Sequence, residues 1–179
     1  MIRKNDLENL VNRYGLGYQY EKVNEQYKTP PETEERRQEK KKSNKNQPQR
    51  LLLTWLVEHP EMYQYIRAYI GADDFIEPLY HSVAIMLFEQ LDNEEKINPA
   101  AILSRFTDAE EQKEIAAIFN THLKYGLSSE DEDKALSDVV RKVKLASIED
   151  EMVHTSDIVR WQELLSLKNK MQKFSISRS

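Results

Sequence analysis

From residue 51 onward, apolar residues recur every three or four positions, which is the spacing of one face of an α-helix. No stretch of useful length alternates apolar and polar residues as a half-buried strand does. Helix start and stop residues divide the pattern into segments of about 50–58, 60–70, 78–91, 99–106 and 107–126. The sequence therefore predicts an all-α fold that contains a helical bundle over residues 50–128.

Turn and capping residues support these segments. Pro60 and Pro78 suit the first turn of a helix, where a missing N–H costs nothing. Gly71 is expected to end the second helix in a left-handed conformation. The predicted N-terminal caps are Asn98 before Pro99, Thr107 with Glu110, and Ser129 with Glu132.

A long helix and a shorter one are predicted to follow as a C-terminal helical hairpin over residues 129–179. No helix breaker occurs between residues 130 and 153, and Thr155, Ser156 and Asp157 supply a cap for the last helix, which runs to about Phe174. The apolar stripe of the long helix changes direction along its length. It consists first of Leu136, Val139, Val140 and Val143, and then of Leu145, Ile148 and Met152. The two halves are therefore expected to face different neighbours.

The last helix carries more apolar positions than one hairpin contact can use. One line consists of Ile158, Trp161 and Leu165, and a second consists of Leu164, Leu167, Met171 and Phe174. The first line is predicted to face the long helix and close the hairpin. The second either packs on the bundle or docks in a groove of a partner, and the pattern leaves both possibilities open.

The N-terminal part differs in composition. Residues 1–27 read as a short helix with a polar tail, since Leu7, Leu10, Val11 and Tyr14 share one face. Residues 28–49 contain no aliphatic or aromatic residue, so they cannot bury apolar surface to offset the entropy of ordering. A disordered linker is therefore predicted over residues 28–49.

Composition narrows the class of protein. Of the 179 residues, 39% are hydrophobic and 32% are charged, and Cys is absent. A disulfide scaffold, a Cys-based zinc site and a thiol nucleophile are thereby excluded. Residues 1–6 lead into no apolar segment of a signal peptide, and the longest near-apolar run, 51–57, is too short to span a membrane. The sequence predicts a cytoplasmic protein without a membrane partner.

Charge is divided unevenly along the chain. Residues 1–50 contain 12 Lys and Arg against 8 Asp and Glu, a net charge of +4, whereas residues 51–179 contain 14 against 23, a net charge of −9. Affinity for nucleic acid depends largely on neutralising phosphates. Residues 50–179 are therefore expected to bind little or no nucleic acid, and a protein is the expected partner.

Candidate chemistry is sparse. The four histidines lie far apart, and the chain contains no metalloprotease, P-loop or nucleophile-elbow motif. Asp73 and Asp74 could hold a divalent cation, but capping of a helix N-terminus explains an acidic pair better. His81 is expected to be a partly buried packing residue. No catalytic, cofactor-binding or metal-binding residue is predicted.

Several short motifs resemble a known family. Arg50-Leu51-Leu52-Leu53 is followed by Asp74-Phe75 with Pro78 and His81, and then by Asn98-Pro99-Ala100 before Ile102-Leu103. Their order resembles that in the helicase-binding C-terminal domain of bacterial DNA primase, most closely the Bacillus type. Residues 2–23 look like the closing helix of a primase polymerase core; they include Leu7, Leu10, Arg13, Tyr14, Gly15 and Leu16. At Gln49-Arg50 the chain departs from the many related bundles with an acidic residue before the leucine run.

The resemblance implies a function. The bundle would modulate the replicative hexameric helicase, and the hairpin would attach the primase to the helicase's N-terminal collar. The parent protein would be a nucleotidyltransferase whose zinc and magnesium belong to other domains, so this chain would not catalyse a reaction. It is expected to be monomeric alone. The predicted helicase-binding residues are Ile148, Met152, Leu164, Leu167, Lys168, Met171 and Phe174, and the predicted hairpin core is Ile158, Trp161 and Leu165.

Two other functions stay open. The same bundle pattern occurs in the N-terminal collar of the replicative helicase, which is an oligomerisation module. A helical nucleic-acid-binding protein that works through residues 40–45 is the second alternative. The net charge of −9 after residue 50 argues against the latter.

Overall fold

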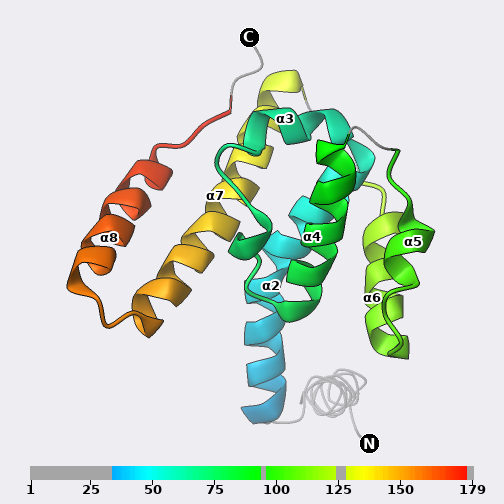
Figure 1. Cartoon of the computed structure of the whole chain (residues 1–179), viewed down its shortest axis with the longest axis horizontal. Helices are drawn as coiled ribbons and strands as arrows, with labels where there is room; N and C mark the ends of the chain where they lie inside the picture. Colours follow the sequence, from blue (N-terminus) through cyan, green and yellow to red (C-terminus); the bar gives the residue numbers. More distant parts are fainter. Residues whose placement is uncertain (1–33, 94–95, 124–127, 177–179) are drawn as a thin grey trace, which may run out of the picture. The chain divides into compact units, whose positions relative to one another are not determined.

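A computed structural model describes residues 34–93, 96–123 and 128–176, with side chains described from residue 46. Two compact units, Met1–Lys42 and Ser43–Ser179, make up the chain. The described residues form helices and no strands, which confirms the all-α prediction (Figure 1). The main helices are α2 (Glu34–Glu58), α4 (Pro78–Asp92), α5 (Pro99–Leu103), α6 (Ala109–Asn120), α7 (Ser129–His154) and α8 (Ile158–Gln172). Among these residues, no helix combines the length and apolar character that crossing a bilayer requires.

Helix α2 begins well before the expected residue 50, so the prediction of a disordered linker is wrong for residues 34–49. The amide Nδ2 of Asn46 donates to Glu77 Oε2 at 2.7 Å, and Gln49 Oε1 accepts from the backbone N of Glu77 at 3.1 Å. Gln49 is also buried. These polar side chains join the folded unit through hydrogen bonds. The absence of apolar residues, on which the prediction of disorder was based, does not exclude such contacts. The predicted helix in residues 1–27 and the linker residues 28–33 lie outside the described residues.

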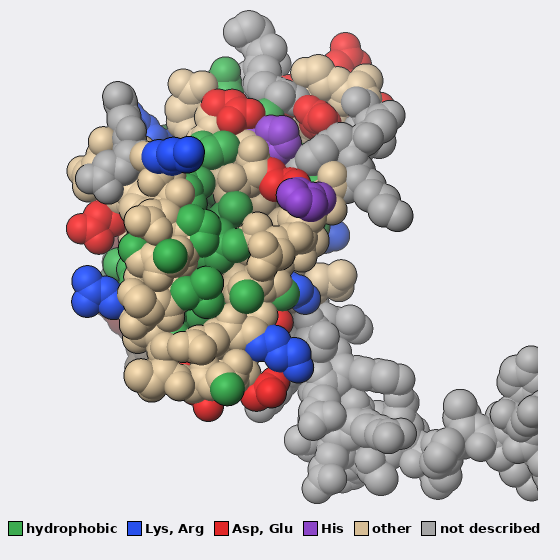
Figure 2. All heavy atoms as spheres, turned by 90° about the vertical axis from the view of Figure 1, so that its right-hand side faces the viewer, with side chains coloured by type: hydrophobic (Ala, Val, Ile, Leu, Met, Phe, Trp, Pro, Cys, Tyr) green, Lys and Arg blue, Asp and Glu red, His purple; other side chains and the backbone are tan. Residues whose placement is uncertain are grey.

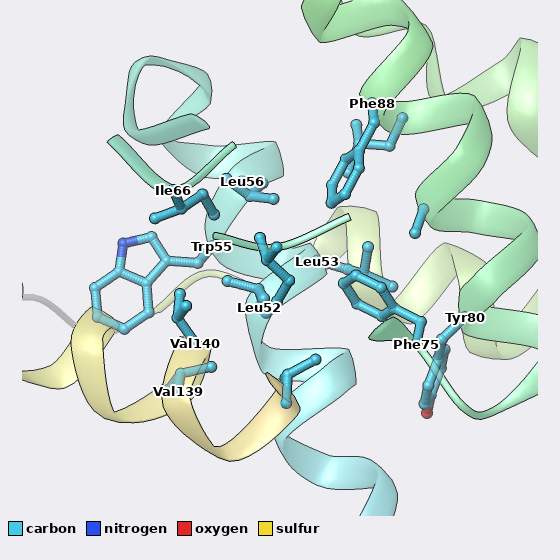
Figure 3. Close-up of a cluster of buried hydrophobic side chains, with 14 of the residues drawn as sticks. Leu52, Leu53, Trp55, Leu56, Ile66, Phe75, Tyr80, Phe88, Val139 and Val140 are labelled. Atoms are coloured by element: carbon cyan, nitrogen blue, oxygen red, sulfur yellow. The ribbon is translucent and has the colours of Figure 1, made fainter. Parts of the chain in front are cut away.

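The second half of α2 lies at the centre of the core. Leu52, Leu53 and Leu56 are fully buried. Figure 3 shows them between the aromatic side chains of Phe75, Tyr80 and Phe88 on one side and Val139 and Val140 of α7 on the other. Because α7 covers α2, one hydrophobic core extends across the boundary predicted at residues 128 and 129. The bundle and the long helix therefore share their core.

The segment between α2 and α4 is less regular than the expected helix over residues 60–70. It consists of η1 (Pro60–Met62), one turn of α3 (Tyr63–Ile66) and η2 (Ala72–Asp74). Gly71 has a φ of −120°, so the predicted left-handed conformation is wrong there, and the residue instead precedes η2 in extended backbone. Aromatic contacts fix the segment, since the ring centroids of Tyr63 and Phe88 are 5.1 Å apart.

The N-terminal caps agree with the sequence to within one residue. Asn98 accepts from the backbone N of Ala101 at 3.1 Å, as predicted. The cap of α6 is Asp108 rather than Thr107, and the cap of α7 is Ser128 rather than Ser129. Asp157 caps α8 by accepting from the backbone N of Val159 at 2.8 Å. Each replacement provides a nearby side-chain oxygen of the type that capping requires.

A largely buried ion pair joins η2 to α7. Lys144 Nζ lies 2.9 Å from both carboxylate oxygens of Asp74, and the backbone N of Gly71 donates to Asp74 Oδ2 at 2.9 Å. Asp74 is buried, whereas its neighbour Asp73 is exposed. The carboxylate considered for a cation is thus occupied by a lysine and a backbone N–H. It positions α7 against the bundle.

We expect Asp74→Ala to lower the free energy of unfolding by roughly 1–3 kcal/mol, because it leaves the partly buried ammonium of Lys144 and the backbone N–H of Gly71 without their acceptor. Asp73→Ala removes an equal charge from an exposed position and should change stability by less than about 0.5 kcal/mol. Urea denaturation followed by circular dichroism measures both. Equal effects of the two substitutions would contradict the structural role of the Asp74–Lys144 pair.

Two buried tyrosines make the core sensitive to alkaline pH. Burial and a hydrogen bond to Asp92 raise the pKa of Tyr63 to about 12. Burial likewise raises the pKa of Tyr80, whose hydroxyl donates to Glu114 Oε1 at 2.9 Å. The folded protein therefore keeps both protons at a pH where the unfolded chain loses them.

Stability should accordingly fall as pH rises above about 10, since the folded state binds more protons than the unfolded state there. We expect Tyr80→Phe to flatten this decline between about pH 9 and about pH 11. Tyr65→Phe, at an exposed tyrosine on α3, should leave the slope unchanged. Free energies of unfolding measured by urea titration at several pH values test the difference, and an unchanged slope for Tyr80→Phe would refute it.

Candidate functional site

The hairpin of α7 and α8 is held in register by charged side chains across its turn. Arg160 makes a two-pronged contact with Glu151, with distances of 2.6 Å from Nε to Oε1 and 3.1 Å from Nη2 to Oε2. Its Nη1 lies 3.2 Å from Glu163 Oε2. The hydrogen bond from Arg160 lowers the pKa of Glu151, and those to Glu151 and Glu163 raise the pKa of Arg160. A planar, bidentate pair of this kind restricts the rotation of α8 about its own axis.

A second ion pair lies further along the hairpin, where Lys168 Nζ is 2.8 Å from Glu149 Oε1. After α8 the chain turns back onto α7. Arg141 Nη2 donates to the carbonyl oxygen of Phe174 at 3.0 Å, and the backbone N of Ile176 donates to Ser137 Oγ at 2.8 Å. These contacts fix both ends of α8 against α7.

The face of α8 that packs inward is the opposite of the predicted one. Leu164 is 1% exposed, and Met171 and Phe174 are also buried. Leu167 is partly buried against the core. Four of the predicted helicase-binding residues therefore belong to the interior.

The two predicted helicase-binding residues of α7 lie inward as well. Ile148 is buried, and Met152 is partly buried against the core. The remaining candidate, Lys168, is partly exposed and pairs with Glu149. Of the seven candidates, it is the one at the edge of the outer surface of α8.

The predicted hairpin core faces solvent. Ile158 is 75% exposed, Trp161 is 41% exposed and Leu165 is 39% exposed. The prediction that these three close the hairpin is wrong, because Leu164 and Met171 are buried instead, and Arg160 and Lys168 reach Glu151 and Glu149 of α7 when α8 packs in this way. Leu164 and Leu165 are adjacent in sequence and point in directions about 100° apart around the helix, so that one is buried and the other is exposed.

This exposed line forms the candidate site. We call Ile158, Trp161 and Leu165 the outer line of α8. Positions three, four and seven residues away on the same side carry Gln162, Asn169 and Gln172, which are exposed and uncharged. Val153 and Val159 add further exposed apolar surface near the turn. The result is an apolar strip with amide neighbours, and charged residues lie to its sides.

Sequence reasoning missed Val153 and Val159 as members of this surface. Among the described residues, five of the eight large hydrophobic side chains that are exposed fall between positions 153 and 165. The signal in the sequence was that Val153, Ile158 and Val159 flank the predicted cap at residues 155–157, where a turn exposes them. Arg160 was also missed, because its partner Glu151 lies across the turn and is identified only by three-dimensional register.

A second surface with hydrophobic side chains, on the side of α5 and α6, is less exposed than the outer line of α8. Figure 2 shows the side of the fold that carries α5 and α6, where hydrophobic side chains gather in the centre of the face. Three large hydrophobic residues of α5, α6 and the loop between them are partly buried and pack against the core: Leu103, Phe106 and Phe119. On α4, Ile85 is exposed as a single residue. The outer line of α8 is the more continuous exposed apolar surface of the two.

No group of three or more His, Asp or Glu residues in the described ranges could hold a metal ion. The histidines lie in separate environments: Nδ1 of His81 is 2.9 Å from the carbonyl oxygen of Ala72, and Nδ1 of His122 is 2.9 Å from Glu58 Oε1. His81 is partly buried, as the sequence indicated.

No protein-family model, curated protein or solved structure matches the chain in comparisons with known proteins. Its function is therefore argued from the outer line of α8 and from the sequence motifs.

The adjacent leucines offer a direct test of the orientation of α8. Leu164→Ala should lower the free energy of unfolding by about 2–5 kcal/mol, because it leaves a cavity between α7 and α8. Leu165→Ala removes the same atoms from an exposed position and should cost less than about 1 kcal/mol. Urea denaturation of both variants measures the difference. A larger loss for Leu165→Ala would show that the outer line packs inward.

Proposed function

We propose that this chain is the helicase-interaction part of a bacterial DNA primase, and that it docks on the N-terminal collar of the replicative hexameric helicase. The ordered motifs from Arg50 to Leu103 support this proposal through their resemblance to the primase domain. The observation that carries it is the outer line of α8, an apolar surface on a rigid hairpin without a partner within the described residues.

The composition of the outer line suits a protein interface. The centres of such interfaces are depleted in charge and enriched in aromatic residues, and truncation of a central Trp is often the most costly change. Trp161 lies between Ile158 and Leu165 on this line, and its amide neighbours can form hydrogen bonds without desolvating a charge. Trp161 is the proposed anchor, and Lys168 is at the edge of the contact.

The rigidity of the hairpin favours the same role. Arg160 and Lys168 fix α8 on α7, and α7 is part of the core through Val139, Val140 and Val143. A surface that is ordered before binding loses less conformational entropy on association. Force or displacement at α8 would also reach the bundle through α7. This coupling is a physical route by which docking at the hairpin could bring the bundle to act on the helicase.

Trp161→Ala should weaken binding to the cognate helicase by at least roughly tenfold, because an aromatic anchor typically contributes more than about 1.4 kcal/mol. Its helicity should stay near that of the unmodified chain, since Trp161 does not belong to the core. Ile85→Ala removes an exposed apolar side chain from α4 and serves as the control, with unchanged affinity. Titration of labelled protein with helicase, together with circular dichroism, measures both properties.

Unchanged affinity in Trp161→Ala with intact helicity would contradict the assignment of the anchor. Failure of the unmodified chain to bind helicase at micromolar concentrations would contradict the proposed function as a whole.

A further inference from the structure

The turn of the hairpin combines its apolar strip with an excess of carboxylates. Residues 149–168 contain five acidic residues and two basic ones, a net charge of −3 with His neutral. The acidic residues are Glu149, Asp150, Glu151, Asp157 and Glu163. The basic residues are Arg160 and Lys168.

Both basic side chains are engaged inside the hairpin. Arg160 binds Glu151 and Glu163, and Lys168 binds Glu149. Asp150 and Asp157 have no contact with Lys or Arg in the described part of the chain. Asp150 Oδ2 is 3.4 Å from His154 Nδ1, and Asp157 receives backbone N–H groups as the cap of α8. The remaining field at the turn is therefore negative.

Asp157 lies beside the outer line, and Asp150 lies near the exposed Val153 on the other side of the turn. Asp157 is four residues before Trp161, a spacing that places both on one side of the helix. Asp150 is three residues before the exposed Val153 at the end of α7. An apolar centre with acidic groups at its border is complementary to an apolar groove that is bordered by Lys and Arg.

We propose that the hairpin recognises an apolar protein groove edged by basic residues, and that Asp150 and Asp157 steer association with it. This inference rests on the proposed function and identifies the chemistry of the collar surface that would receive α8. A second copy of this chain would be repelled, because it would carry the same negative border. Nucleic acid would also be repelled, because its phosphates are negatively charged.

Steering by charge predicts how fast the complex forms. With the N-terminal collar of the cognate helicase as the probe, the association rate constant should fall roughly fivefold or more between about 20 mM and about 300 mM salt. The dissociation rate constant should change less, because the apolar outer line governs it. Stopped-flow fluorescence of the labelled chain provides both rates.

The double variant Asp150→Asn with Asp157→Asn removes the two charges and keeps an efficient cap, since Asn caps helices as well as Asp does. Its association rate constant at low salt should be roughly threefold or more below that of the unmodified chain, with a weaker salt dependence. The matched control is Asp108→Asn with Glu111→Gln. It changes a helix cap and one more carboxylate on α6, on the other side of the fold (Figure 1).

Each outcome separates the two proposals. Collar binding with a rate that neither salt nor the double variant alters more than the control overturns the steering inference and leaves the proposed function standing. Absence of collar binding by the unmodified chain overturns both. Concentration-dependent self-association that Trp161→Ala abolishes, seen by analytical ultracentrifugation, would assign the outer line to a second copy and overturn the inference.

Discussion

Helix α7 packs on two neighbours with two different faces, and the position of every other functional element follows from this packing. Its first half contributes Val139, Val140 and Val143 to the core around α2. In its second half, Ile148 is buried in the core and Met152 packs against it, within the hairpin that α7 forms with α8. The Asp74–Lys144 pair lies at the point where one stripe gives way to the other. A single rigid helix thereby connects the bundle core to the outer surface of α8.

Much of this arrangement could be predicted from the sequence because it depends on local periodicity. The change of stripe along α7 was evident from the offset between Val143 and Leu145, and the helix starts were evident from Asn98, Asp157 and the two prolines. These signals involve residues within one or two turns of each other, where helix geometry alone relates them. The structure moves some caps by one residue, since adjacent Ser, Thr and Asp side chains compete for the same backbone N–H groups.

The orientation of α8 could not be predicted in the same way, because both of its apolar lines satisfy the period of a helix. The choice between Leu164 and Leu165 depends on how α8 packs on α7, and the contacts that accompany it, Arg160 with Glu151 and Lys168 with Glu149, join residues of two different helices. The part of α2 directly before residue 50 was not predicted for a related reason. Asn46 and Gln49 form hydrogen bonds to Glu77, which is about thirty residues away in the sequence. Amino-acid composition does not reveal such distant partners.

The orientation of α8, with Leu164 inside and Leu165 outside, changes how the hairpin would recognise a partner. If Leu164 and Met171 were the contact residues, binding would require α8 to leave α7, which would expose the hairpin core at a cost of several kcal/mol. With Ile158, Trp161 and Leu165 outside, the contact surface already exists in the free protein. Binding then needs no free energy to separate α8 from α7, so the affinity is not reduced by a rearrangement. The hairpin could also remain packed on the bundle. A surface of this kind would suit an adaptor that transmits contact at α8 to the core through α7, because α8 is already packed on α7 in the free protein.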